Sequence, residues 1–189
     1  MKALPSNYRL ALQLDLVRSK KQLRLVTGLS VAILLLALVP ALLVRPLKET
    51  FSTLAPLKIL ALSLGSLAYI PLHELVHALF MKCFGCERVR FGFKLLYAYA
   101  GCDEYFYKWP YLIIALSPVI LWGALMWVLA ACFPQWFWVI YAVQLLNLSG
   151  AAGDVYVTWR LMRMPASILI RDMGTSMFVY QKAKNDPQE

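Results

Sequence analysis

Long apolar stretches separated by short polar segments dominate this 189-residue chain. The four stretches cover about residues 25–44, 57–81, 111–133 and 136–159. Each is close to the ~20 residues that an α-helix needs to cross a hydrocarbon core ~30 Å thick. The pattern therefore predicts an all-α membrane protein with about four transmembrane helices, folded as a single polytopic domain over residues 1–189 with a polar tail at 160–189.

The segment between the second and third apolar stretches has a different pattern. Arg88–Phe91 and Leu96–Tyr99 contain β-branched and aromatic residues, and Gly92 and Gly101 follow them. Such runs bounded by glycine predict strands, so we expect a small β-hairpin at the membrane surface. Met177–Gln181 predicts one more short strand, which we expect to pack on this hairpin.

Residues 6–24 precede the first apolar stretch and mix Leu10, Leu14 and Val17 with basic side chains. This composition favours a short amphipathic helix on an anionic leaflet, and a disordered basic tail is the alternative. The apolar stretch that follows is longer than the roughly 7–15 residues of a cleaved signal peptide, and no small-x-small cleavage site follows it. We therefore expect a retained signal anchor.

Composition and charge support a membrane protein. Hydrophobic residues make up 61% of the chain and charged residues 15%, against ~25% charged in typical soluble domains. The net charge is +9, and the basic residues concentrate before the first stretch, between the second and third, and after the fourth. Because Lys and Arg mark the cytoplasmic side, we expect a multi-pass protein of the cell membrane with both termini and the 82–110 loop in the cytoplasm. Basic residues that alternate with apolar stretches also exclude nucleic acid as the expected partner.

The four cysteines, Cys83, Cys86, Cys102 and Cys132, are too few and too scattered for a disulfide framework. Cys83 and Cys86 form a C-x-x-C in the loop expected to be cytoplasmic, where thiols stay reduced. Free thiols are the expected state. A second zinc site that includes Cys102 is the alternative, although it lacks an evident fourth ligand.

The chemistry is concentrated in His73-Glu74-Leu75-Val76-His77, an H-E-x-x-H sequence inside the second apolar stretch. His73 and His77 are the only histidines of the chain. Residues four apart share one helix face, so both imidazoles can bind one ion, with Glu74 beside it as a candidate general base. Ionisable residues are costly in hydrocarbon and are therefore functional candidates. The pattern predicts a zinc site within the membrane.

A catalytic zinc site needs a third protein ligand and an open position for water. Asp154 is the candidate, because it and Glu74 are the only acidic residues inside the apolar stretches. At ~1.5 Å per residue, His77 lies roughly 7–8 Å from the boundary at Lys82, and Asp154 about 9 Å from the boundary at Arg160. We therefore expect the histidines and Asp154 at one depth, near the cytoplasmic face.

The fourth apolar stretch also carries a polar face. Its members recur every three or four residues: Gln144, Asn147, Ala151, Asp154 and Thr158. Ser149 and Gly153 form a small-x-x-x-small pair, which lets helices approach closely, as a short aspartate requires to reach a metal on another helix. Each of these features alone is also compatible with ordinary helix packing.

The order of an H-E-x-x-H helix, a hairpin, a proline-bearing stretch and a stretch with an aspartate resembles the site-2 protease group of intramembrane zinc metallopeptidases. The chain is more closely similar to the zincin peptidase family of bacterial membrane proteins, in the sequences 73–77 and 149–154 and over about residues 57–158. The resemblance implies that His73, His77 and Asp154 bind Zn²⁺, that Glu74 is the general base, and that Asn147 faces substrate, where it would help to hold the oxyanion. Unlike the site-2 proteases, this chain has glycine before Asp154 and valine after it.

Together with these features, the resemblance implies a zinc metalloendopeptidase that cleaves membrane or membrane-associated proteins near the cytoplasmic face, within the lipid bilayer. The edge of the 88–99 hairpin would hold the unwound substrate segment as an added strand. A regulatory partner and a homo-oligomer are left open. The alternatives are a catalytically inactive, metal-binding regulatory protein of the same fold, and a small transporter. A transporter would need a polar path across the bilayer, yet the first and third stretches are almost free of ionisable groups.

Overall fold

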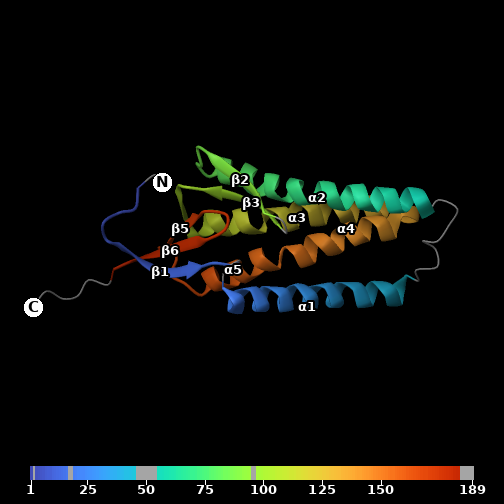
Figure 1. The fold of residues 1–189 in the computed structure, drawn as a ribbon, viewed down its shortest axis with the longest axis horizontal. Helices are drawn as coiled ribbons and strands as arrows, with labels where there is room; N and C mark the ends of the chain where they lie inside the picture. Colours follow the sequence, from blue (N-terminus) through green and yellow to red (C-terminus); the bar gives the residue numbers. More distant parts are fainter. Residues whose placement is uncertain (2, 17–18, 46–54, 95–96, 184–189) are drawn as a thin grey trace, which may run out of the picture.

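The computed structural model describes residues 1, 3–16, 19–45, 55–94 and 97–183. Within these ranges the helices form an elongated bundle, and the strands gather at one end of it (Figure 1). The helices are α1 (Lys20–Val44), α2 (Ala55–Cys83), α3 (Lys108–Cys132), α4 (Phe137–Gly150) and α5 (Ala152–Met162), and a short 3-10 turn, η2 (Pro134–Trp136), precedes α4. The strands are β1 (Tyr8–Leu14), β2 (Val89–Lys94), β3 (Tyr97–Cys102), β4 (Tyr105–Tyr107), β5 (Leu169–Asp172) and β6 (Met177–Lys182).

Three helices, α1, α2 and α3, are long and apolar enough to cross a membrane. Their surfaces carry large apolar side chains that face outward: Leu36 in α1 is 76% exposed and Leu67 in α2 is 69% exposed. Continuous apolar exposure of this kind is unfavourable in water and suits a surface that contacts lipid. The protein is thus mostly helical, with three candidate membrane-spanning helices.

The fourth predicted span, 136–159, is divided into α4 and α5, which follow one another along the bundle (Figure 1). The division falls at Ala151, whose φ of −75° and ψ of 7° lie outside the α-helical region. Gly150 and Gly153 flank it, and glycine is a poor helix former. Neither helix alone has the length of a span, so a fourth crossing, made by the two in succession, stays a prediction.

The all-α prediction is wrong at the end of the bundle where the strands gather. There β1, β6, β5 and β4 form an antiparallel sheet in that order. β1 lies within residues 6–24, the segment for which an amphipathic helix or a disordered tail was predicted. Leu10, Leu12 and Leu14 recur every second residue, a period that favours a strand, and Leu14 is buried. Helix α1 begins only at Lys20, after Ser19 accepts a hydrogen bond from the Gln22 N–H.

The strand predicted at 177–181 is confirmed as β6, but it pairs with β1 and β5 rather than with the hairpin. The hairpin itself consists of β2 and β3, with Val89 opposite Cys102, and it follows α2 in the chain, while its place at the membrane surface stays a prediction. Leu96, where its second strand was predicted to begin, lies outside the described residues. Asp103 links the two sheets, because its carboxylate pairs with Arg90 of β2 and Arg171 of β5.

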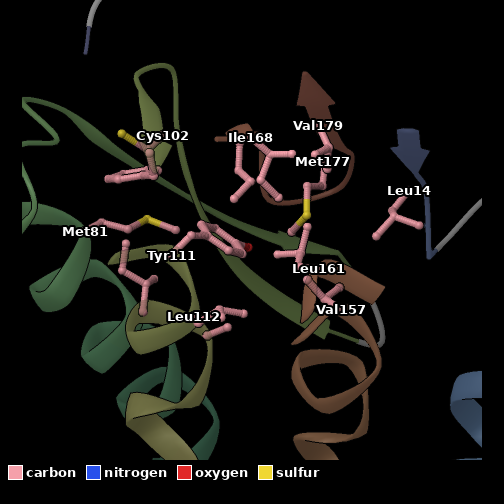
Figure 2. Close-up of a cluster of buried hydrophobic side chains, with 14 of the residues drawn as sticks. Leu14, Met81, Cys102, Tyr111, Leu112, Val157, Leu161, Ile168, Met177 and Val179 are labelled. Carbon is pink, nitrogen blue, oxygen red and sulfur yellow. The ribbon is translucent and has the colours of Figure 1, made fainter. Parts of the chain in front are cut away.

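A hydrophobic core joins the strands to the helix ends (Figure 2). Leu14 of β1, Met81 of α2, Tyr111 of α3, Leu161 of α5 and Val179 of β6 all lie in it. Burying one such side chain stabilises a fold by roughly 1.5–3 kcal/mol. The core therefore holds the C-terminal part of α2, which carries the H-E-x-x-H sequence, in a fixed position relative to α5 and the strands.

Candidate metal centre

The two histidines lie one turn apart on α2 and face the interior. Their ring centroids are 4.9 Å apart, and each residue is only 9% exposed. The spacing of four residues puts them on one face of the helix, as the sequence predicts.

Asp154 lies opposite this pair, in the first turn of α5. Its Oδ2 is 3.4 Å from Nε2 of His73, and its Oδ1 is 3.5 Å from Nε2 of His77. The interruption at Ala151 is what gives Asp154 this place, because a new helix begins there and its N-terminal dipole favours a carboxylate. The structure thus brings together the three residues that the sequence predicts as ligands.

The residues of this cluster fit a zinc ion. The ligand atoms of His73, His77 and Asp154 all lie within 4.8 Å of one another. Both Nδ1 atoms are engaged elsewhere, with the Ile114 carbonyl for His77 and the Tyr69 hydroxyl for His73, so both Nε2 atoms face Asp154. Two imidazoles and one carboxylate are a donor set that catalytic zinc sites use, with one position left for water or substrate.

A pocket of about 350 Å³ opens onto the cluster. The residues that line it come from α2, β3, α4 and α5: Tyr69, Ile70, His73, Glu74, His77, Ala98, Gly150, Gly153 and Asp154. Because Ala98 belongs to β3, the hairpin forms part of the wall of this pocket. A ligand in the pocket would touch the three clustered residues, Glu74 and the strand at once.

Glu74 is held by the hairpin. Its Oε2 accepts a hydrogen bond from the backbone N–H of Ala100 at 2.8 Å. Ala100 is in β3, and this N–H points away from β2, toward α2. The sequence predicts Glu74 beside the metal and a hairpin near it, but not that the strand fixes the carboxylate.

Asn147 does not line the pocket. The residue is fully buried, its Nδ2 donates to the carbonyl of Val119 at 3.1 Å, and its Oδ1 accepts from the Tyr69 hydroxyl at 3.0 Å. The resemblance implies contact with substrate, and the structure instead gives Asn147 a place in the packing of α4 against α2 and α3. Tyr69, the residue that links it to His73, was not predicted, although it lies four positions before His73 and therefore on the same face of α2.

Two of the four cysteines differ from the predicted free-thiol state. Cys86 and Cys102 form a disulfide, while Cys83 and Cys132 are free and exposed. The fold brings the turn after α2 against the end of β3, a contact between residues 16 positions apart that spacing alone does not predict. The Glu104 carboxylate lies beside this pair, and the three residues are close enough to share a metal ion, but sulfurs that are bonded to each other provide no thiolate ligand. The predicted second zinc site therefore requires that this disulfide be reduced.

The chain was compared with known proteins and protein families. A family model described as "Putative zincin peptidase" matches residues 66–169, more than half of the chain. The matched region contains His73, Glu74, His77, the hairpin and Asp154. No curated protein and no solved structure matches the chain.

Proposed function

The chain belongs to the zincin peptidase family, and we propose that it is an intramembrane zinc metalloendopeptidase that cleaves membrane or membrane-associated proteins. One observation carries the proposal: His73 and His77 of α2 converge on Asp154 of α5, with Glu74 on the wall of the same pocket. The likeness to the site-2 protease group is part of the proposal, and it rests on the order of the helix, hairpin and aspartate along the chain.

In this proposal each residue of the site has a defined role. His73, His77 and Asp154 would hold Zn²⁺, which when bound polarises a scissile carbonyl and makes water more acidic. Glu74 accepts a proton from the attacking water and passes it to the leaving amine. The Ala100 N–H keeps the Glu74 carboxylate turned toward the pocket, because it occupies one carboxylate oxygen and leaves the other available.

The edge of β3 offers a place for the substrate. Among the described residues β3 pairs with β2 along one edge only, and Ala98 on its other edge lines the pocket. A helical substrate hides its peptide bonds in internal hydrogen bonds, so the segment to be cut must be unwound. Backbone groups of β3 could bind that segment as an added strand and present it to the site.

The membrane setting of the proposal rests on the three apolar helices and on the distribution of charge. The site lies in the C-terminal half of α2, and the basic loop that follows α2 favours the cytoplasmic side for this end. We therefore place the reaction within the bilayer, near the cytoplasmic face.

The experiment compares wild-type protein with Glu74→Gln, both reconstituted in liposomes with a panel of transmembrane peptides. Glutamine has nearly the same shape but cannot accept the proton, so we expect wild-type protein to release cleavage products and the variant to be slower by roughly 10²–10⁴-fold. Zinc content should be equal in the two proteins. Equal cleavage rates would remove Glu74 from the mechanism, and zinc-loaded wild-type protein that cleaves no peptide would favour the inactive, metal-binding protein.

A further inference from the structure

The third helix, α3, supplies none of the three candidate ligands, yet two of its backbone carbonyls lie in hydrogen bonds beside them: the Ile114 carbonyl contacts Nδ1 of His77, and the Val119 carbonyl accepts from Asn147. We propose that α3 fixes the orientation and the protonated nitrogen of both rings, and that Pro118, Asn147 and Tyr69 are positioning residues of the metal centre. The inference rests on the proposed function, since it takes His73 and His77 as zinc ligands.

Pro118 explains why a carbonyl of α3 is available to His77. In an α-helix the carbonyl of residue 114 would accept from the N–H of residue 118, but proline has no N–H. The free carbonyl of Ile114 instead lies 2.9 Å from Nδ1 of His77, and it also accepts from the Ser117 hydroxyl. Because a carbonyl can only accept, Nδ1 carries the proton and Nε2 keeps its lone pair. That lone pair faces Asp154.

His73 is oriented through a longer path that ends on the same helix. The Asn147 Nδ2 donates to the carbonyl of Val119, which fixes the amide so that its Oδ1 faces Tyr69. The Tyr69 hydroxyl donates its only proton to that oxygen, so it must accept from Nδ1 of His73, which is 2.7 Å away. His73 therefore also carries its proton on Nδ1 and turns Nε2 toward Asp154.

The hydrogen bonds of Asn147 and Tyr69 are costly to lose because both residues are buried. Asn147 is fully buried and Tyr69 is 7% exposed, so water cannot easily replace a lost partner. Gly123 of α3 lies directly against this path, because a Cβ there would be 3.5 Å from Nδ2 of Asn147. Groups that bond to the second nitrogen of a ligating histidine typically change metal affinity by ~10–100-fold when removed.

Zinc affinity of the detergent-purified full chain, measured by competition with a chromogenic chelator, gives the first test. We expect Tyr69→Phe to weaken zinc binding by ~10–100-fold. The matched control is Tyr141→Phe, which also removes a buried hydroxyl, one that donates to the Ala37 carbonyl on α1 and touches neither histidine. Its zinc affinity should equal that of wild-type protein. Equal affinities for the two variants would overturn the inference.

Nuclear magnetic resonance gives a second readout that general loss of packing would not reproduce. The chain has two histidines, so zinc-loaded protein labelled with [¹⁵N]histidine should show two Nδ1–H signals. Tyr69→Phe should shift one signal and speed its exchange with solvent, Pro118→Ala should do so to the other, and Tyr141→Phe should change neither. Protons on Nε2 in the zinc-loaded wild-type protein, or no selective change in the variants, would contradict the inference. Wild-type protein that binds no zinc would instead contradict the proposed function and this inference with it.

Discussion

At the scale of single residues, the candidate site depends on hydrogen bonds that fix the orientation of Glu74 and of the two histidines. Glu74 has the position that a general base needs because the Ala100 N–H binds one of its oxygens. The histidines present Nε2 because their Nδ1 atoms are bound. The partners in these bonds are the Ala100 N–H of β3, the Ile114 carbonyl of α3 and the Tyr69 hydroxyl of α2, and none of the three belongs to a sequence motif.

The Ala100 bond can be tested by removing its donor. Ala100→Pro deletes the N–H that binds Glu74 without touching the ladder to β2, because this N–H lies on the other edge of β3. Hydrogen bonds to charged groups contribute about 1.5–3 kcal/mol, so we expect kcat of peptide cleavage to fall by roughly 10–100-fold while zinc remains bound.

Ala98→Pro is the matched control for that variant. Residues two apart on a strand direct their N–H groups to the same edge, so Ala98→Pro removes a donor from the edge where substrate is proposed to bind, without touching Glu74. It should raise KM more than it lowers kcat. A kcat for Ala100→Pro that equals the kcat of Ala98→Pro would show that the Glu74 contact has no role in the reaction.

The sequence allows the three ligand candidates and Glu74 to be predicted, because residue type, helical spacing and the cost of charge in hydrocarbon all select the same few side chains. Tyr69 and Pro118 could not be assigned in this way. Tyrosine and proline are common in membrane helices, and their role here depends on which carbonyl or ring a neighbouring helix brings near. The resemblance implies a substrate contact for Asn147, but the sequence does not show whether neighbouring helices cover the helix face on which this residue lies.

At the scale of helices and strands, the long apolar helices follow directly from the sequence and the small sheet does not. A run of about 20 apolar residues has few alternatives to a spanning helix. The strands β1, β4, β5 and β6 are short, and their partners are far away in the chain, so pairing rather than local preference decides them. The alternation of Leu10, Leu12 and Leu14 is the signal for β1 in the sequence, but the run is short and its pairing partner β6 lies near the other end of the chain.

The contribution of β1 to the fold can be measured with two leucines. Leu14 of β1 is 1% exposed in the core of Figure 2, while Leu36 of α1 is 76% exposed. Leu14→Ala removes buried contacts and should destabilise the fold by about 2–5 kcal/mol, whereas Leu36→Ala should have little effect. Thermal unfolding in detergent, monitored by circular dichroism, would show this difference as a lower unfolding temperature for Leu14→Ala. Equal unfolding temperatures for the two variants would place β1 outside the folded core.

At the scale of the whole molecule, two observations favour different compartments for the segment between α2 and α3. Its basic residues favour the cytoplasm, whereas a disulfide between Cys86 and Cys102 is typical of oxidising compartments. The two free cysteines can show which compartment is correct, because Cys83 is the last residue of α2, next to this segment, and Cys132 is the last residue of α3. In an alternating topology these two positions lie on opposite sides of the membrane.

Labelling of intact spheroplasts with a membrane-impermeant maleimide should therefore modify Cys132 and leave Cys83 unmodified until the membrane is opened. This result follows from the distribution of Lys and Arg. Single-cysteine versions, made by replacing the other free cysteine with serine, would assign the signal to one position. Labelling of Cys83 from outside would show that the topology is the reverse of the one expected, with the disulfide in an oxidising compartment. Labelling of both from one side would contradict the alternating spans.

The central claim is that one metal centre is assembled from two helices, α2 and α5, by His73, His77 and Asp154. Zinc content per chain of purified protein, wild type against Asp154→Asn, tests it most directly, because asparagine keeps the size of the side chain and removes the anionic ligand. We expect about one zinc per wild-type chain, the stoichiometry of a single tetrahedral site, and a large loss in the variant after dialysis against a chelator that leaves wild-type protein loaded. Equal zinc in the two proteins, or wild-type protein without zinc, would contradict the claim.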